Sequence, residues 1–264
     1  MNIGICFLTT DKKINNLIVN YIKTKLSECI NNNINSNKKY ELYTLLETEE
    51  LNFTDYHKIP FNFNILKEKY NNRFFYIYKN FRGICHLPLF YFYDLHSEYD
   101  YYIFYEDDLL YTGFLFENNN NPFNTIPFEN YDMMFMYDRI DNPNWHWRSK
   151  CEYNIPKKWI PYEGLLNCYI ISNKALKELK DFCTNYSWDG HHELLVNSFF
   201  MNQQDKYKIG FVEKYIPCYI NWLWVTTYQQ LFFKELSQYC FIHPIKNNDN
   251  LKYVKSKCIN IKEY

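Results

Sequence analysis

Three adjacent acidic residues, Glu106, Asp107 and Asp108, end an apolar and aromatic run in the stretch YIFYEDDLLYTG. Carboxylates this close repel one another, so a cation is the first candidate for a partner that makes them tolerable. In an extended backbone, residues i and i+2 share a face, which places Glu106 and Asp108 on one side and Asp107 on the other. Such a pair at the end of a strand suits Mg²⁺ or Mn²⁺ with a phosphate-bearing substrate. The alternative is that the acids cap a turn or helix after the strand.

Two later residues are further candidates for chemistry. Pro244 disfavours a helical conformation at His243, so this imidazole should project from extended chain, where it suits Mn²⁺ better than Mg²⁺ or simply hydrogen-bonds in a turn. Glu193 opens an apolar-periodic stretch, and there it is either a first-turn acid favoured by the helix dipole or a general base. His191 and His192 do not form the H-E-x-x-H pattern, which excludes a zinc peptidase of that type.

Alternating strand and helix patterns must position these residues. Apolar runs predict strands in NIGICFLTTD, YELYTLLE, FFYIY, YYIFY, YDMMFMY and GLLNCYIIS. Helical spacing predicts helices in LPLFYFYDLHSEY, NKALKELKDF and HHELLVNSFFMN, and one helix whose apolar face holds Ile14, Leu17, Ile18, Tyr21, Ile22, Leu26, Cys29 and Ile30. This order predicts an α/β fold with a mostly parallel central sheet and helices on both faces, which binds ligands at its open end. Residues 138–162 fit no recognised element pattern, so they are either a lid or binding loop or an element that the pattern does not reveal.

Composition narrows the class of protein. The 264 residues favour one large domain, and 29 basic against 30 acidic residues give no electrostatic basis for binding nucleic acid. Nine cysteines without a C-x-x-C pair favour the reducing cytoplasm over a disulfide framework or a zinc knuckle. No signal peptide or transmembrane stretch is evident, so any membrane contact is expected to be peripheral. The six glycines are too far apart for a dinucleotide fingerprint, a P-loop or a nucleophile elbow.

Several segments together resemble GT-A glycosyltransferases. The acidic triplet is similar to their D-x-D or E-D-D element, including that of N-acetylglucosaminyltransferase I and of family 2-like enzymes. In the order of that family, KNFRGICHLPLF resembles the Asn-x-x-Gly region, YEGLLNCYIIS the strand lining the donor sugar, and WDGHHELL the acidic segment before the acceptor-side helix. FIHPIK resembles the His-Pro-x-Lys element near the end of many such transferases. The chain departs from the family at Glu106, where many members have Asp, and at GHHE, where many have two acids.

The resemblance implies a role for each matching residue. It implies a metal site, for Mn²⁺ or Mg²⁺, at Asp108, His243 and Glu106. It implies that Glu193 is the catalytic base, with Asp189 as the second candidate. The residues implied in nucleotide-sugar binding are Arg82, Glu106, Asp107, Gly164 and Lys246, although Arg82 could equally be a solvated loop residue. Trp145, Trp147 and Trp188 are candidate platforms for the acceptor sugar, or core residues.

The expected function is metal-dependent transfer of a sugar from a nucleoside-diphosphate sugar, with UDP-sugar favoured, to a hydroxyl of a glycan or of a lipid-linked or protein-linked acceptor. The nucleotide-binding half would cover about residues 1–113 and the acceptor-binding half about residues 114–264 of a single domain. Inversion and retention of the anomeric configuration both remain open. One alternative is a sugar-nucleotide pyrophosphorylase, although the N-terminal stretch IGICFLTTDKK lacks the glycine-rich phosphate loop of that class. The other is a catalytically inactive glycan-binding domain of the same fold.

Overall fold

The computed structural model describes residues 1–32, 37–51, 54–70, 85–115, 121–137, 156–185, 191–220, 239–246 and 248–259. Its centre is a seven-stranded sheet in the order β3-β2-β1-β4-β7-β6-β8. The strands are β1 (Asn2–Thr10), β2 (Lys39–Glu47), β3 (Lys58–Phe61), β4 (Tyr101–Glu106), β6 (Met133–Phe135), β7 (Cys168–Ser172) and β8 (Ile209–Phe211). Only β7 among them runs antiparallel to its neighbours, while the other pairs are parallel. The predicted α/β fold with a mostly parallel sheet is confirmed.

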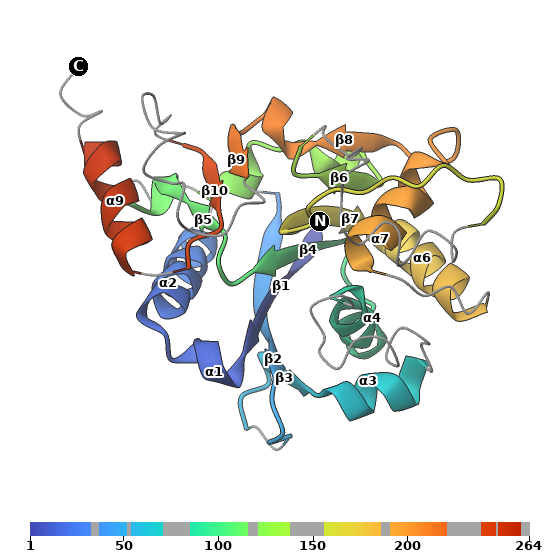
Figure 1. The fold of residues 1–264 in the computed structure, drawn as a ribbon, viewed down its shortest axis with the longest axis horizontal. Coiled ribbons are helices and arrows are strands. Elements are labelled where there is room, and N and C mark those ends of the chain that lie inside the picture. Colours follow the sequence, from blue (N-terminus) through green and yellow to red (C-terminus); the bar gives the residue numbers. More distant parts are fainter. Residues whose placement is uncertain are drawn as a thin grey trace.

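Helices cover both faces of this sheet (Figure 1). One face packs against α3 (Phe63–Tyr70), α4 (His86–Leu95), α6 (Asn173–Asn185) and α7 (His192–Met201). The other face packs against α2 (Leu17–Asn31) and α9 (Asn248–Ile259). β1 serves both layers, because Ile3, Ile5 and Phe7 point into the second core and Cys6 and Leu8 into the first.

A second, three-stranded sheet, which the sequence did not predict, lies on the α2 side. It has the order β5-β10-β9, formed by β5 (Leu110–Tyr111), β10 (Phe241–His243) and β9 (Cys218–Ile220). Thr112 reinforces it, donating its backbone N–H to the Cys240 carbonyl at 2.8 Å and accepting the Cys240 N–H at its hydroxyl at 2.9 Å. This sheet brings a strand from the end of the chain against the residues that follow β4.

The first predicted helix is corrected in its start and in its buried face. α1 (Asp11–Ile14) is a separate short helix, and α2 begins after Asn16, whose side chain accepts the Ile18 N–H at 2.8 Å. Leu17 is 73% exposed, whereas Val19 is buried. The cap therefore rotates the first turn relative to the face that apolar spacing predicted.

The remaining predicted elements fall as follows. The helix expected in LPLFYFYDLHSEY ends at Leu95, and the predicted strand FFYIY lies outside the described residues. Of the unassigned stretch 138–162, residues 156–162 are described and contain no helix or strand. Instead they bind the surface of α7, where Tyr162 donates its N–H to the Ser198 hydroxyl at 2.9 Å and Ile160 pairs with Asn202. None of the helices in the described ranges has the length and apolar character needed to span a bilayer.

Candidate active site at the carboxyl end of β4

The acidic triplet lies in the tight turn that joins β4 to β5. Glu106 is the last residue of β4, and the Leu109 N–H returns to the Glu106 carbonyl at 3.2 Å. Asp107 and Asp108 are buried, with only 4% and 6% of their surface exposed. Buried carboxylates are expensive unless they are paired, so their partners decide what the turn can do.

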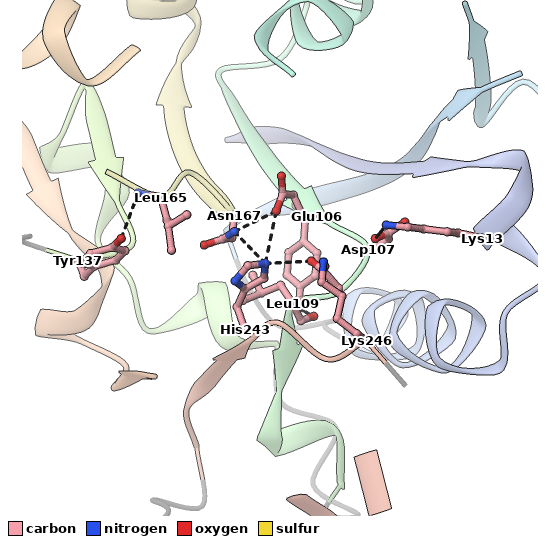
Figure 2. Close-up of polar contacts among 11 residues, drawn as sticks. Lys13, Glu106, Asp107, Leu109, Tyr137, Leu165, Asn167, His243 and Lys246 are labelled. Carbon is pink, nitrogen blue, oxygen red and sulfur yellow. Dashed lines mark hydrogen bonds and ion pairs between the residues drawn. The ribbon is translucent and has the colours of Figure 1, made fainter. Parts of the chain in front are cut away.

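Glu106 and Asp108 face the same side, where His243 joins them. His243 Nε2 lies 3.1 Å from Asp108 Oδ1 and 3.6 Å from Glu106 Oε2. Figure 2 shows the imidazole reaching from β10 toward the carboxylates at the end of β4. The predicted shared face of Glu106 and Asp108 and the extended conformation of His243 are both confirmed as geometry.

Asn167 completes this group, and the sequence reasoning missed it. Its amide nitrogen donates to Glu106 Oε2 at 3.0 Å and lies 2.9 Å from His243 Nε2. The residue immediately precedes β7, which runs antiparallel to β4, so the start of β7 lies beside the end of β4. A polar residue at the start of an apolar run was the available signal, but the antiparallel direction was not predicted.

The surroundings of His243 Nε2 make opposite demands on this nitrogen. The Asn167 side-chain NH₂ group has two hydrogens and donates one to the Glu106 carboxylate and the other to His243 Nε2. For the second hydrogen bond, Nε2 must carry a lone pair. The Asp108 carboxylate, 3.1 Å away, requires a proton there instead. A cation between the imidazole and the carboxylates would satisfy both the lone pair and the negative charges.

Asp108 already attracts a cation from the protein itself. The Lys246 ammonium bonds to Asp108 Oδ2, and the Ile245 N–H donates to the Asp108 carbonyl at 2.8 Å. Burial alone would raise the pKa of Asp108, but His243 and Lys246 together outweigh it and hold that pKa well below the usual range. Asp108 is therefore the residue of the triplet whose environment most favours the ionised form.

Asp107 points to the opposite side, as predicted. It accepts hydrogen bonds from the Thr9 hydroxyl and the Lys13 ammonium, each at 2.8 Å, and Figure 2 shows it directed away from His243 toward Lys13. Burial, and next the charge of Asp108, raise the pKa of Asp107 despite these two partners. Asp107 thereby links the turn to the end of β1, and Thr9 and Lys13 were further residues that sequence reasoning did not single out.

Glu193 lies in the first turn of α7 and interacts electrostatically with Glu106. His191 is the N-cap, accepting the Glu193 N–H at Nδ1 at 3.3 Å, and the same Nδ1 lies 3.8 Å from Glu193 Oε2. Burial, and next the charge of Glu106, raise the pKa of Glu193 well above its ordinary value. A carboxyl with a raised pKa, close to a charged site, has the electrostatic character expected of a general base.

Gly164 binds the start of the same helix through its backbone. Its N–H donates to the Glu193 carbonyl at 3.3 Å, and its carbonyl accepts the Asn197 side-chain amide at 2.9 Å. Gly164 therefore positions α7 and lies at the approach to β7. The other predicted site residues, Arg82, Trp145, Trp147, Trp188 and Asp189, lie outside the described residues.

The side chains present fit a hard divalent ion. Glu106, Asp108 and His243 each offer one ligand atom, and these atoms lie within 4.8 Å of one another. Two carboxylate oxygens and one imidazole nitrogen suit Mn²⁺, and are less suited to Mg²⁺, which seldom takes nitrogen. A divalent ion would also accept the lone pair of His243 Nε2 while neutralising the nearby Asp108 carboxylate.

Comparisons with known proteins give a similarity of structure alone. No protein-family model matches the chain, and no curated protein matches its sequence. One similar solved structure is the galactosyltransferase LgtC in complex with donor and acceptor sugar analogs, with 8% identity, a TM-score of 0.44, and coverage of 98% of this chain and 94% of that one. Another is an active-site mutant of LgtC, with 10% identity, a TM-score of 0.47, and coverage of 98% and 95%. At these TM-scores the similarity carries no functional argument, so we base the proposed function on the site.

Proposed function

We propose that this protein is a metal-dependent GT-A glycosyltransferase that moves a sugar from a nucleoside-diphosphate sugar to an acceptor hydroxyl. The observation that carries the proposal is the convergence of Glu106, Asp108 and His243 at the carboxyl end of β4. Ligands of α/β sheets bind at this edge. The two carboxylates come from the middle of the chain and the imidazole from its end, where the FIHPIK segment resembles that of the same enzyme class.

On the donor side, Asp108, His243 and Glu106 would hold the metal, Mn²⁺ in preference to Mg²⁺. The bound metal would offset the negative charge of a departing nucleoside diphosphate. Lys246, now paired with Asp108, would turn to the diphosphate oxygens. Asp107, held by Lys13, would keep the turn in the conformation that presents its neighbours or contact the nucleotide. Arg82 and Gly164 would complete the donor site.

On the acceptor side, Glu193 would take the proton from the attacking hydroxyl, with Asp189 as the second candidate. Burial, and next the charge of Glu106, raise the pKa of the Glu193 carboxyl, which makes its ionised form a stronger base. Trp145, Trp147 and Trp188 would stack against acceptor sugars. We further propose one domain with its nucleotide-binding half near residues 1–113 and its acceptor-binding half near 114–264, working in the cytoplasm or peripherally at a membrane.

The decisive experiment measures Mn²⁺ binding, and UDP binding with and without Mn²⁺, by titration calorimetry. Asp108→Asn removes one charge with little change of shape, so Mn²⁺-dependent UDP binding should fall at least about tenfold, or by about 1.4 kcal/mol. Asp94→Asn is the matched control, because this carboxylate is likewise paired with a lysine but lies on α4. It should keep the Mn²⁺ affinity of the wild type.

Two outcomes would oppose the proposal. Equal Mn²⁺ affinity in Asp108→Asn and wild type would remove the metal from this side of the turn. Metal-dependent UDP binding without hydrolysis or transfer of any sugar, in a screen of several nucleotide sugars, would instead indicate an inactive binding domain of this fold.

A further inference from the structure

A second group of potential ligands also includes Glu106. Cys85, Glu106 and His192 each offer one ligand atom, and these atoms lie within 4.8 Å of one another. The three residues come from three different elements. Cys85 is the N-cap of α4, Glu106 ends β4, and His192 is the first residue of α7. The ends of two helices and one strand therefore converge on one point.

Glu106 has an oxygen for each group. Its contacts with Asn167 and His243 both use Oε2. Figure 2 shows its second carboxylate oxygen directed away from His243. Because a carboxylate can bind one cation through each oxygen, the residue can take part in both sites.

The types of residue in this group differ from those of the first. Thiolate, imidazole and carboxylate together are ligands of Zn²⁺ and of similar borderline-soft ions, whereas Mn²⁺ and Mg²⁺ avoid sulfur. Cys85 and His192 are both at least nine-tenths buried. A thiolate at Cys85 and the shared Glu106 carboxylate bring negative charge to this point, and a buried ion needs such partners to be tolerated.

A neighbouring histidine supports this interpretation. His86 follows Cys85, is 1% exposed, and has both ring nitrogens buried without a hydrogen-bond partner among the described residues. The His86 ring packs against Phe90, with centroids 5.3 Å apart. A buried imidazole of this kind is available to accept a hydrogen bond from a water bound beside the proposed ion.

We propose that Cys85, Glu106 and His192 form a second cation site, specific for a thiophilic divalent ion of the Zn²⁺ class and sharing Glu106 with the first. Binding forms a metal–sulfur bond at Cys85 Sγ, and the thiol proton passes to solvent. The bound ion would fasten the start of α4 and the start of α7 to the end of β4. It would also orient the free side of Glu106, next to Glu193.

The test uses Co²⁺ as a spectroscopic substitute for Zn²⁺ on the metal-free protein. A thiolate ligand produces a sulfur-to-cobalt charge-transfer absorption, which oxygen and nitrogen ligands alone do not. We expect this absorption in the wild type, its displacement by Zn²⁺, and its loss in Cys85→Ser. His192→Gln should weaken Co²⁺ binding at least about tenfold.

Matched controls use residues of the same type elsewhere. Cys218→Ser removes a partly exposed thiol of β9 and His96→Gln a half-buried imidazole after α4, and both should keep the absorption. Asp108→Asn should also keep it while losing Mn²⁺-dependent UDP binding, so a failure of this site and a failure of the proposed function are read separately. Absence of the charge-transfer band in the wild type, or its survival in folded Cys85→Ser, would overturn the proposal.

Discussion

The three carboxyls of the triplet are adjacent in sequence, yet they have three different environments. Asp108 has two basic neighbours, His243 and Lys246, and its pKa is lowered in spite of burial. Glu106 has a raised pKa, through burial and next through the charge of Asp108. Asp108 is thus ionised and can bind a cation directly, while Glu106 becomes easier to ionise when a cation binds beside it.

Lys246 competes with the proposed metal for Asp108, which gives a prediction for Lys246→Met. Without nucleotide, removal of the ammonium should tighten Mn²⁺ binding by about 5- to 30-fold, since a charge-assisted hydrogen bond is worth about 1–2 kcal/mol at this exposure. UDP binding in the presence of Mn²⁺ should weaken, because the diphosphate loses a cation. Titration calorimetry measures both affinities.

The control for this change is Lys25→Met, which removes a lysine paired with Glu28 on α2, far from the triplet in sequence. It should change neither affinity. If Lys246→Met binds Mn²⁺ no more tightly than wild type, the ammonium does not occupy the place of a metal.

Glu193→Gln separates the proposed base from the donor site. UDP affinity should stay near that of the wild type, while glycosyl transfer should fall by about 10²-fold or more, because the base acts only on the acceptor. Normal transfer by this variant, combined with an inactive Asp189→Asn, would reverse the two assigned roles.

The same variant carries a prediction about pH and stability. The pKa of Glu193 in the folded protein is raised above its ordinary value of 4.5, so the folded state favours the protonated form. The contribution of the protonated Glu193 carboxyl to the free energy of unfolding is fully present below pH 4.5. It is lost as pH rises toward the raised pKa, by up to about 1.4 kcal/mol per pH unit. Glu193→Gln should therefore gain stability relative to wild type as pH rises above 4.5. Urea unfolding of both proteins in chelator, from pH 4.5 upward, measures this difference, and a constant difference would contradict the raised pKa.

At the scale of elements, the three-stranded sheet explains how His243 reaches the triplet. β10 pairs with β5, which begins two residues after Asp108, and the Ile245 N–H closes onto the Asp108 carbonyl. These hydrogen bonds hold the segment 239–246 against the turn. Any ligand that binds this arrangement stabilises it relative to its opened forms.

We therefore predict that Mn²⁺ and UDP together slow hydrogen exchange in this segment. The reporters are the backbone amides of Cys240, Phe241 and Ile245, whose acceptors are defined. His243→Ala should abolish the slowing and weaken Mn²⁺ binding, because the segment loses its contact with the metal. His96→Ala is the control, and an equal slowing in His243→Ala and wild type would show that the imidazole does not connect ligand to segment.

At the scale of the whole molecule, the central sheet separates two hydrophobic cores, and β1 contributes side chains to both. Gly4 lies on the side of α4, where a Cβ atom would meet the Tyr99 ring at 3.0 Å and the Phe92 ring at 3.2 Å. Neither ring can withdraw easily, because the two stack on each other with centroids 6.2 Å apart and the Tyr99 hydroxyl bonds to Glu41 at 2.6 Å.

Gly4→Ala should consequently destabilise the fold by about 1–3 kcal/mol, as expected for overpacking of a filled core. Urea unfolding monitored by circular dichroism measures the change. Thr24→Ala, on an exposed position of α2, is the control and should stay within about 0.5 kcal/mol of wild type. A neutral Gly4→Ala would mean that the two rings move apart at little cost.

The strands β1, β2, β4, β6 and β7 and the helices α2, α4, α6 and α7 were predictable from sequence, because they follow from local periodicity, whereas β3, α3, β8, α9 and the three-stranded sheet were not predicted. Apolar runs of period 2 and 3.6 report which residues are buried next to their own chain neighbours. The shared face of Glu106 and Asp108 was predicted from an extended backbone, but the structure produces it in a turn at the end of β4. The proximity of His243 was expected from a family resemblance, not from any local pattern. Asn167, Lys13 and the Cys85–His192 pair were not expected at all.

These residues share one physical reason for having been missed. Each enters the site through pairing between segments distant in the chain: the antiparallel β4–β7 ladder for Asn167, the adjacent ends of β1 and β4 for Lys13, and the meeting of two helix starts for Cys85 and His192. Strand direction and helix docking depend on how whole faces pack, and local spacing carries little information about that packing. The periodicity of the sequence therefore predicts most helices and strands and the position of Glu106 and Asp108 at the end of β4. Only the tertiary packing shows which basic and polar side chains lie next to these two carboxylates.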